Sequence, residues 1–79
     1  MATTKNKSAS KPVVLGLIGC GNISDSYFNG AAKSKLVTIK ACADIRPEAA
    51  QSKASQHKVL AMSIAELLAD KDISIVINL

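Results

Sequence analysis

The sequence has 79 residues, of which 48% are hydrophobic and 20% are charged. Because a typical domain has roughly 100–150 residues, the chain holds one small domain or part of a larger one, and not two domains. The composition is that of a globular chain rather than a disordered one. No run of about 18 apolar residues is present, which excludes a membrane-spanning helix and a membrane partner.

The net charge of +4 is concentrated at the start of the chain. Residues 1–11 contain Lys5, Lys7 and Lys11 and no acidic residue, which leaves seven basic residues against six acidic ones in residues 12–79. We expect residues 1–11 to form a disordered basic tail, because they lack apolar periodicity. The remainder is nearly neutral and has one Tyr, one Phe and no Trp, so we expect no nucleic-acid partner.

Apolar runs and helical periodicities alternate after the tail. In chain order they predict a strand at 13–18, a helix from 23 to about 33, a strand at 36–43, a helix opening at 47, a strand at 59–62, a helix from 64 to about 70 and a strand at 73–79. Pro47 suits the first position of a helix, and Ser63 with Glu66 predicts a capping box. Strands separated by helices predict an α/β fold, a doubly wound parallel sheet with helices on both faces.

Side-chain patterns lead to two further expectations. In the first helix, Ile23, Tyr27 and Ala31 are spaced four residues apart, so we expect them to form its buried face. We expect His57, the only histidine, to lie in a solvated loop before the third strand.

The two cysteines form no CxxC pair and no larger framework. We therefore expect reduced thiols and a cytoplasmic protein. Packing is the ordinary role for both Cys20 and Cys42. Cys20 has the better claim to reactivity, because a thiol near a helix N-terminus can have a lowered pKa.

The predicted sheet is incomplete at its fourth strand. A doubly wound sheet places this strand beside the first and then continues with a further helix and strand. We therefore expect residues 12–79 to be the N-terminal part of a longer protein.

A glycine-rich turn lies between the first strand and the first helix, at residues 19–24 with the sequence GCGNIS. Gly19 permits the tight turn. Gly21 has no Cβ, so a pyrophosphate can approach the backbone amides at the helix N-terminus. Ser24 replaces the third glycine of the usual fingerprint, at a position that serves packing of the helix on the strand.

Asp44 lies at the end of the second strand, 23 residues beyond Gly21. An acidic residue there can accept hydrogen bonds from the adenosine ribose, which is typical of NAD-binding proteins. Arg46 follows two residues later and could meet a 2′-phosphate, so NADP is not excluded. An ordinary surface Asp–Arg pair on a turn is the alternative.

These motifs resemble the N-terminal domain of the glucose-fructose oxidoreductase, inositol dehydrogenase and rhizopine catabolism (Gfo/Idh/MocA) family. The similar segments are, in order, VVLGLIGCGNIS, ACADIRPEAA, VLAM, SIAELLAD and DISIVINL, which together extend over residues 13–79. In that family a Thr-Pro turn after the fourth strand touches the cofactor, and a later Glu-Lys-Pro motif supplies a lysine that assists hydride transfer. Both would lie beyond Leu79, so no catalytic residue can be named. The resemblance thus implies that residues 12–79 are the N-terminal part of an NAD(P)-binding domain and that the substrate domain is absent from this chain.

The resemblance implies a set of cofactor contacts. They are Gly19, Gly21, Asn22 and Ile23 in the phosphate turn, Asp44, Ile45 and Arg46 around the adenosine, and Leu79 beside the ribose. No metal site is expected.

The leading hypothesis is an NAD(P)-dependent oxidoreductase of a sugar, polyol or related hydroxylated small molecule, acting as a homo-oligomer when full length. We expect these 79 residues alone to be inactive, because they supply half of a cofactor site and no hydride-transfer group. The alternatives are a nucleotide-binding module without redox chemistry, since the fold does not fix function, and an S-adenosylmethionine-dependent methyltransferase. Methyltransferases usually have GxGxG, and Ile23 occupies the last of these positions.

Overall fold

The structure of the protein is a computed structural model that describes residues 11–79. The predicted basic tail, apart from Lys11, lies outside the described residues. Within residues 11–79, no helix has the length and apolar character needed to cross a membrane.

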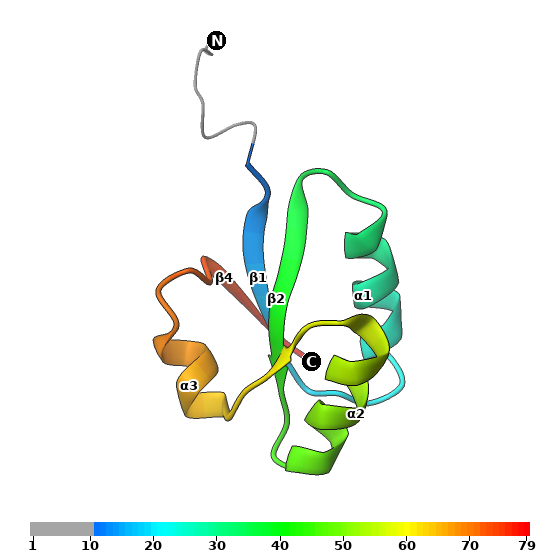
Figure 1. Ribbon diagram of the computed structural model, residues 1–79, viewed down its shortest axis with the longest axis vertical. Helices are drawn as coiled ribbons and strands as arrows, with labels where there is room; N and C mark the ends of the chain where they lie inside the picture. The colour runs from blue at the N-terminus through cyan, green and yellow to red at the C-terminus, as the bar shows by residue number, and fades with distance from the viewer. Residues whose placement is uncertain (1–10) are drawn as a thin grey trace, which may run out of the picture.

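Four parallel strands form one sheet in the order β3-β2-β1-β4 (Figure 1). The elements in chain order are β1 (Val13–Ile18), α1 (Ser24–Ala32), β2 (Val37–Ala43), α2 (Pro47–His57), β3 (Leu60–Ala61), α3 (Ile64–Ala69) and β4 (Ile75–Asn78). The predicted α/β fold is therefore confirmed. The third and fourth strands are shorter than predicted.

The helices lie on both faces of the sheet, with α1 and α2 on one face and α3 on the other (Figure 1). Under α1 and α2 the core consists of Leu15, Leu17, Cys20, Phe28, Ile39, Cys42, Ala50 and Ala54. On the opposite face Leu67 of α3 packs on Ala41 and Ala43 of β2. Side chains from alternate positions of the central strands thus fill two separate layers, as expected for a parallel sheet covered on both faces.

Local signals fix the starts of two helices. Pro47 occupies the first turn of α2, where its missing N–H is not needed. At α3 the predicted capping box is present: the Glu66 amide donates to Ser63 Oγ at 3.0 Å, and the Ser63 amide donates to Glu66 Oε1 at 2.9 Å.

The buried face of α1 differs from the prediction. Ile23 precedes the helix and is 63% exposed, and Tyr27 is 40% exposed. Ser24 and Phe28 are buried instead, while Ala31 packs at the edge of the core as expected. The reason is local: Ser24 Oγ donates to the Gly21 carbonyl at 2.6 Å, which satisfies the buried hydroxyl and turns position 24 toward the sheet.

The loop placement of His57 was also wrong. His57 is the last residue of α2, and Lys58 ends the helix in the left-handed conformation with φ 59°. The imidazole stacks on Phe28 with ring centroids 4.2 Å apart, and its Nε2 lies 2.9 Å from Asp25 Oδ1. Lys53 Nζ donates to the same carboxylate at 2.8 Å. This cluster joins α1 to α2 across one face of the sheet.

Gly16 in β1 sets how closely α3 approaches the sheet. A Cβ at this position would lie 2.8 Å from Leu67 Cδ2 and 3.1 Å from Ile73 Cδ1, both inside van der Waals contact. By contrast, nothing lies within 4 Å of a Cβ built at Gly30 in α1. The two glycines therefore have different roles: only Gly16 is required for packing.

Replacement of Gly16 by Ala should destabilise the protein by about 1–3 kcal/mol, because Leu67 must move away from its buried position. Gly30→Ala is the matched control, and it should leave stability unchanged or raise it by up to about 1 kcal/mol, since Ala favours a helix. Urea denaturation of both variants measures the difference. Equal stability of the two variants would contradict the assigned role of Gly16.

Candidate dinucleotide-binding site

The site lies where the carboxyl ends of three strands meet. In the register of the sheet, Ile18 pairs with Ala43 of β2 and with Asn78 of β4. The residues that follow these strand ends are therefore brought together. In open parallel sheets a ligand binds at such an edge, where the strand order reverses direction, here between β1 and β4.

Gly19 begins the turn after β1 in a conformation that disfavours other residues, with φ +105°. A Cβ at Gly19 would lie 3.2 Å from the Leu79 carbonyl oxygen and 3.3 Å from Leu79 Cβ. The Gly19 amide donates to the Ala43 carbonyl at 2.8 Å, and the Leu79 amide donates to the Ile18 carbonyl at 2.9 Å. Both β2 and β4 thus hold the start of the turn.

The second half of the turn is open. Nothing lies within 4 Å of a Cβ built at Gly21. The amides of Gly21, Asn22 and Ile23 have no hydrogen-bond acceptor within residues 11–79, whereas the Ser24 amide donates to the Gly21 carbonyl at 3.0 Å. Three unpaired amides at the positive end of α1 form an anion-binding geometry, which suits a pyrophosphate.

Asp44 lies beside this turn, directly after β2. Its side chain is 9% exposed. The Arg46 amide donates to Oδ1 at 2.9 Å and the Cys20 amide donates to Oδ2 at 2.7 Å. These bonds, that of Arg46 first, hold the pKa of Asp44 below its ordinary value, so the carboxylate is charged at neutral pH.

Arg46 is only loosely associated with this carboxylate. Its Nε is 3.8 Å from Asp44 Oδ1, and its side chain is 66% exposed. The pairing expected between these residues is present, yet the guanidinium remains in solvent. An exposed pair of this kind contributes little to stability.

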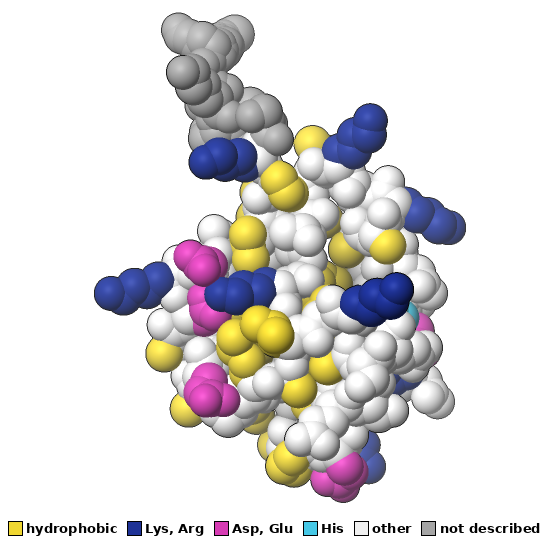
Figure 2. Space-filling model, in the orientation of Figure 1, with side chains coloured by type: hydrophobic (Ala, Val, Ile, Leu, Met, Phe, Trp, Pro, Cys, Tyr) yellow, Lys and Arg dark blue, Asp and Glu magenta, His cyan; other side chains and the backbone are white. Residues whose placement is uncertain are grey.

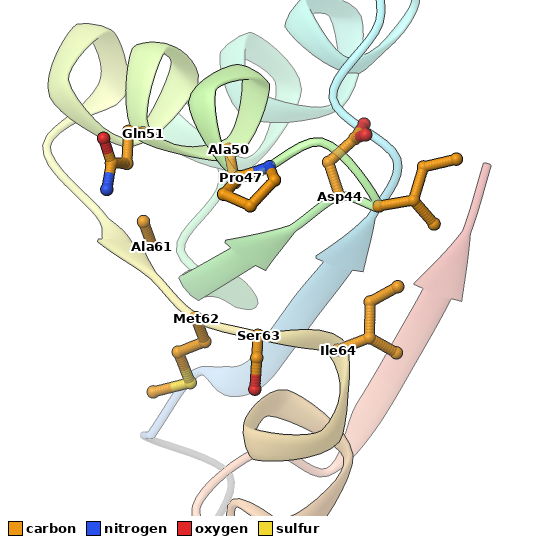
Figure 3. A pocket seen from close by; sticks show the side chains of 9 residues that line it. Asp44, Pro47, Ala50, Gln51, Ala61, Met62, Ser63 and Ile64 are labelled. Carbon is orange, nitrogen blue, oxygen red and sulfur yellow. The ribbon is translucent and has the colours of Figure 1, made fainter.

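Two hollows share Asp44 and Ile45. One of about 350 Å³ is lined by Ile18, Gly19, Asp44, Ile45, Arg46, Asn78 and Leu79. The other, of about 370 Å³, is lined by Asp44, Ile45, Pro47, Ala50, Gln51, Ala61, Met62, Ser63 and Ile64. Figure 3 shows the second hollow between α2 and the segment that leads into α3, with the Asp44 carboxylate turned toward the loop that follows β1.

The structure brings most of the expected contact residues together. Five of them, Gly19, Asp44, Ile45, Arg46 and Leu79, line the first hollow, and the other three form the adjacent open turn. Sequence reasoning missed Ile18 and Asn78 in this hollow. Both are the last residues of their strands, so the rule that ligands bind at strand ends could have identified them.

The two cysteines are buried, free thiols. The suggestion that Cys20 has a lowered pKa was wrong: burial is the largest effect and raises the pKa of this thiol. Burial likewise raises the pKa of Cys42 to about 12. Cys20 Sγ donates to the Ala43 carbonyl at 3.4 Å, and Cys42 Sγ donates to the Ala50 carbonyl at 3.5 Å. Both side chains therefore act as packing groups. Within residues 11–79 no cluster of three or more His, Cys, Asp or Glu is placed to hold a metal ion.

On the surface, lysine and arginine side chains on the face shown in Figure 2 stand apart from one another, with acidic and apolar side chains between them. The parallel sheet with helices on both faces defines a Rossmann-like α/β fold.

Comparisons with known proteins agree with this class. No protein-family model and no curated protein matches the sequence. Among solved structures, the WlbA dehydrogenase of Chromobacterium violaceum, in complex with NADH and UDP-GlcNAcA, is 26% identical with a TM-score of 0.77, over 86% of this chain and 20% of that one. A protein of Sinorhizobium meliloti assigned as a myo-inositol dehydrogenase is 25% identical with a TM-score of 0.74, over 85% of this chain and 21% of that one.

A third neighbour, from Desulfitobacterium hafniense and assigned as an NADPH-dependent oxidoreductase, is 22% identical with a TM-score of 0.79, over 86% of this chain and 20% of that one. The chain thus spans about a fifth of the length of these structures. The neighbours are NAD(P)-dependent oxidoreductases of the Gfo/Idh/MocA type, matched over their N-terminal Rossmann part. The resemblance found in the sequence is confirmed at this level.

In the native protein both cysteines should resist alkylation by iodoacetamide at about pH 8. Only the thiolate reacts, and the Cys42 thiol, with a pKa of about 12, is ionised in roughly one molecule in 10,000 at that pH. Burial also raises the pKa of Cys20 and shields its sulfur from the reagent. Mass spectrometry of the labelled protein measures the rate, and the urea-unfolded protein provides the control, in which both thiols should react. Rapid labelling of Cys20 in the folded protein would show that the turn opens or that its thiol is activated.

Proposed function

We propose that residues 12–79 are the N-terminal, cofactor-binding part of an NAD(P)-dependent oxidoreductase that acts on a sugar, polyol or related hydroxylated molecule. The observation that carries the proposal is the charged, nearly buried Asp44 beside three backbone amides that have no acceptor within residues 11–79. A dinucleotide presents a pyrophosphate, which such amides can bind, and a ribose diol, which such a carboxylate can bind.

The residues present fit the two halves of this ligand. The open amides of Gly21, Asn22 and Ile23 would hold the pyrophosphate at the N-terminus of α1. The carboxylate of Asp44 would accept from the ribose hydroxyls, and Ile45, which is 85% exposed, offers an apolar surface for the adenine. Together with Gly19, Arg46 and Leu79 in the first hollow, these are the proposed contacts. The nicotinamide, when bound, supplies the hydride chemistry.

The chemistry and assembly of the complete enzyme are part of the same proposal. We assign no catalytic residue within residues 12–79, and we expect these residues alone to turn over no sugar or polyol. The likeness to a dehydrogenase with bound UDP-GlcNAcA and to a protein assigned as a myo-inositol dehydrogenase supports a small hydroxylated substrate. We expect the complete enzyme to be a homo-oligomer. Two free, buried thiols support a reducing, cytoplasmic setting.

The complete enzyme should use NAD in preference to NADP. A 2′-phosphate at the ribose would bring two negative groups within about 4 Å of each other, which costs roughly 4 kcal/mol at an effective dielectric of about 20. Arg46 offsets part of this cost, although its exposed guanidinium is screened by solvent. Asp44→Ala should therefore narrow or reverse the preference by removing the negative charge.

Steady-state kinetics with both cofactors measure this preference as a ratio of kcat/KM values. Asp70→Ala is the matched control, because Asp70 is an aspartate in another loop, paired with Lys40 at 2.7 Å; its ratio should equal that of the unmodified enzyme. Equal or better use of NADP by the unmodified enzyme would show that Arg46 governs the ribose site. Nucleotide binding without any redox activity in the complete protein would favour the non-redox alternative.

A further inference from the structure

The carboxylate of Asp44 is shared between two loops. Oδ1 accepts the amide of Arg46, two residues along the chain, at 2.9 Å. Oδ2 accepts the amide of Cys20, 24 residues away in the glycine turn, at 2.7 Å. Both are hydrogen bonds to a charged group, which are shorter and stronger than neutral ones. The negative charge therefore links the end of β2 to the phosphate turn.

The backbone amides of the glycine turn have hydrogen-bond acceptors up to Cys20 and have none at the next three residues of the described part of the chain. The amides of Gly19 and Cys20 point inward, to the Ala43 carbonyl and to the Asp44 carboxylate. The next three amides have no acceptor within residues 11–79. The Ala43 carbonyl accepts the Gly19 amide and the Cys20 thiol, both neutral donors, whereas Asp44 is the charged acceptor that holds the turn. Because Gly19 has a φ of +105° and tolerates many conformations, the turn depends on such contacts for its shape.

We infer that Asp44 is a positioning residue for the phosphate-binding turn, besides its proposed contact with the ribose. By holding the Cys20 amide inward, the carboxylate directs the following amides outward to the pyrophosphate. Each carboxylate oxygen has two lone pairs, so it can keep its backbone donor while it accepts a ribose hydroxyl. The inference rests on the proposed function only for the identity of the ligand.

Among the charged groups near the glycine turn, the Asp44 carboxylate makes the main electrostatic contact with it. The charged or titratable groups that face it are Arg46 on its own loop, Cys20 on the turn and Cys42 on β2. The two thiols are protonated, because burial raises their pKa values. The Arg46 side chain is 66% exposed, and its Nε lies 3.8 Å from Oδ1, whereas the Cys20 amide donates to Oδ2. Neutralisation of Asp44 should consequently weaken its hydrogen bond with the Cys20 amide and let the glycine turn change conformation.

If Asp44 positions the turn, its substitution has an effect that loss of a ribose contact alone would not have. Substitution of Asp44 should weaken the binding of every ligand that uses the pyrophosphate turn, even a ligand without ribose hydroxyls. The probe is an NAD analogue whose adenosine ribose lacks both the 2′- and the 3′-hydroxyl. Asp44→Ala should reduce its affinity roughly tenfold or more, measured by calorimetric titration of the complete protein. Asp44→Asn keeps one acceptor oxygen, so its affinity for the analogue should lie between those of the unmodified protein and Asp44→Ala.

A second measurement needs no ligand. In ¹⁵N-labelled protein at neutral pH, the Cys20 amide proton should resonate far downfield and exchange slowly with solvent, and Asp44→Asn and Asp44→Ala should move it upfield and speed its exchange. The matched control is Asp70→Asn: Asp70 Oδ1 accepts the Asp72 amide at 2.8 Å, so the variant removes the charge from an equivalent backbone-to-carboxylate bond far from the turn. It should shift the Asp72 amide and leave Cys20 and the analogue affinity unchanged.

The outcomes separate the inference from the proposed function. If the Cys20 amide responds to Asp44 as expected but no dinucleotide binds, the positioning role stands and the proposed function fails. If the analogue binds the unmodified protein and Asp44→Ala equally well, or if the Cys20 amide is the same in all Asp44 variants, the inference is overturned while NAD binding is retained. An equal loss of analogue affinity in Asp70→Asn would also overturn it, because the effect would then reflect general destabilisation.

Discussion

The pairing of β1 with a parallel strand on each side is the constraint on which the rest of the structure depends. It buries Leu15 and Leu17 beneath α1 and α2, and it presents Gly16 to α3 on the opposite face. It also aligns the ends of β1, β2 and β4 at one edge, so that a turn, a carboxylate and the end of the chain meet there. The candidate site thus follows from the register of the sheet rather than from any feature of the loops alone.

Much of this arrangement could be predicted from the sequence, because the signals are local. An apolar run without polar alternation indicates a strand buried on both faces, Pro47 and Ser63 mark helix starts, and the glycine turn and Asp44 stand at the strand ends. The errors arose where two local patterns compete. At the start of α1 two pairs of residues have the same helical spacing, Ile23 with Tyr27 and Ser24 with Phe28. The apolar character of Ile23 favoured the first pair as the buried face, whereas the second pair is buried. The hydroxyl of Ser24 is buried because the Gly21 carbonyl accepts its hydrogen bond.

Contacts between distant residues could not be predicted. His57 looked like a loop residue because no sequence rule shows that Lys58 would adopt a left-handed conformation or that Asp25 and Phe28 would lie beside the imidazole. The bond from the Cys20 amide to Asp44 likewise joins residues 24 apart, and it uses a backbone group that carries no side-chain signal. The packing role expected for Cys20 is confirmed, but the suggested lowering of its pKa was wrong for a related reason: burial depends on the neighbours that the fold supplies, and it outweighs the nearby helix end.

The close contact between Gly16 and α3 has a consequence for the evolution of the fold. Leu67 occupies the volume that a side chain at position 16 would need, with Ile73 next to it. These three positions therefore share one fixed volume on this face of the sheet. Sequences that retain the fold should vary them jointly: a larger residue at position 16 should occur with a smaller one at position 67 or 73. Variation in what such a fold binds would then have to come from open parts of the loops at the strand ends, such as the turn at Gly21, where nothing lies within 4 Å of a Cβ.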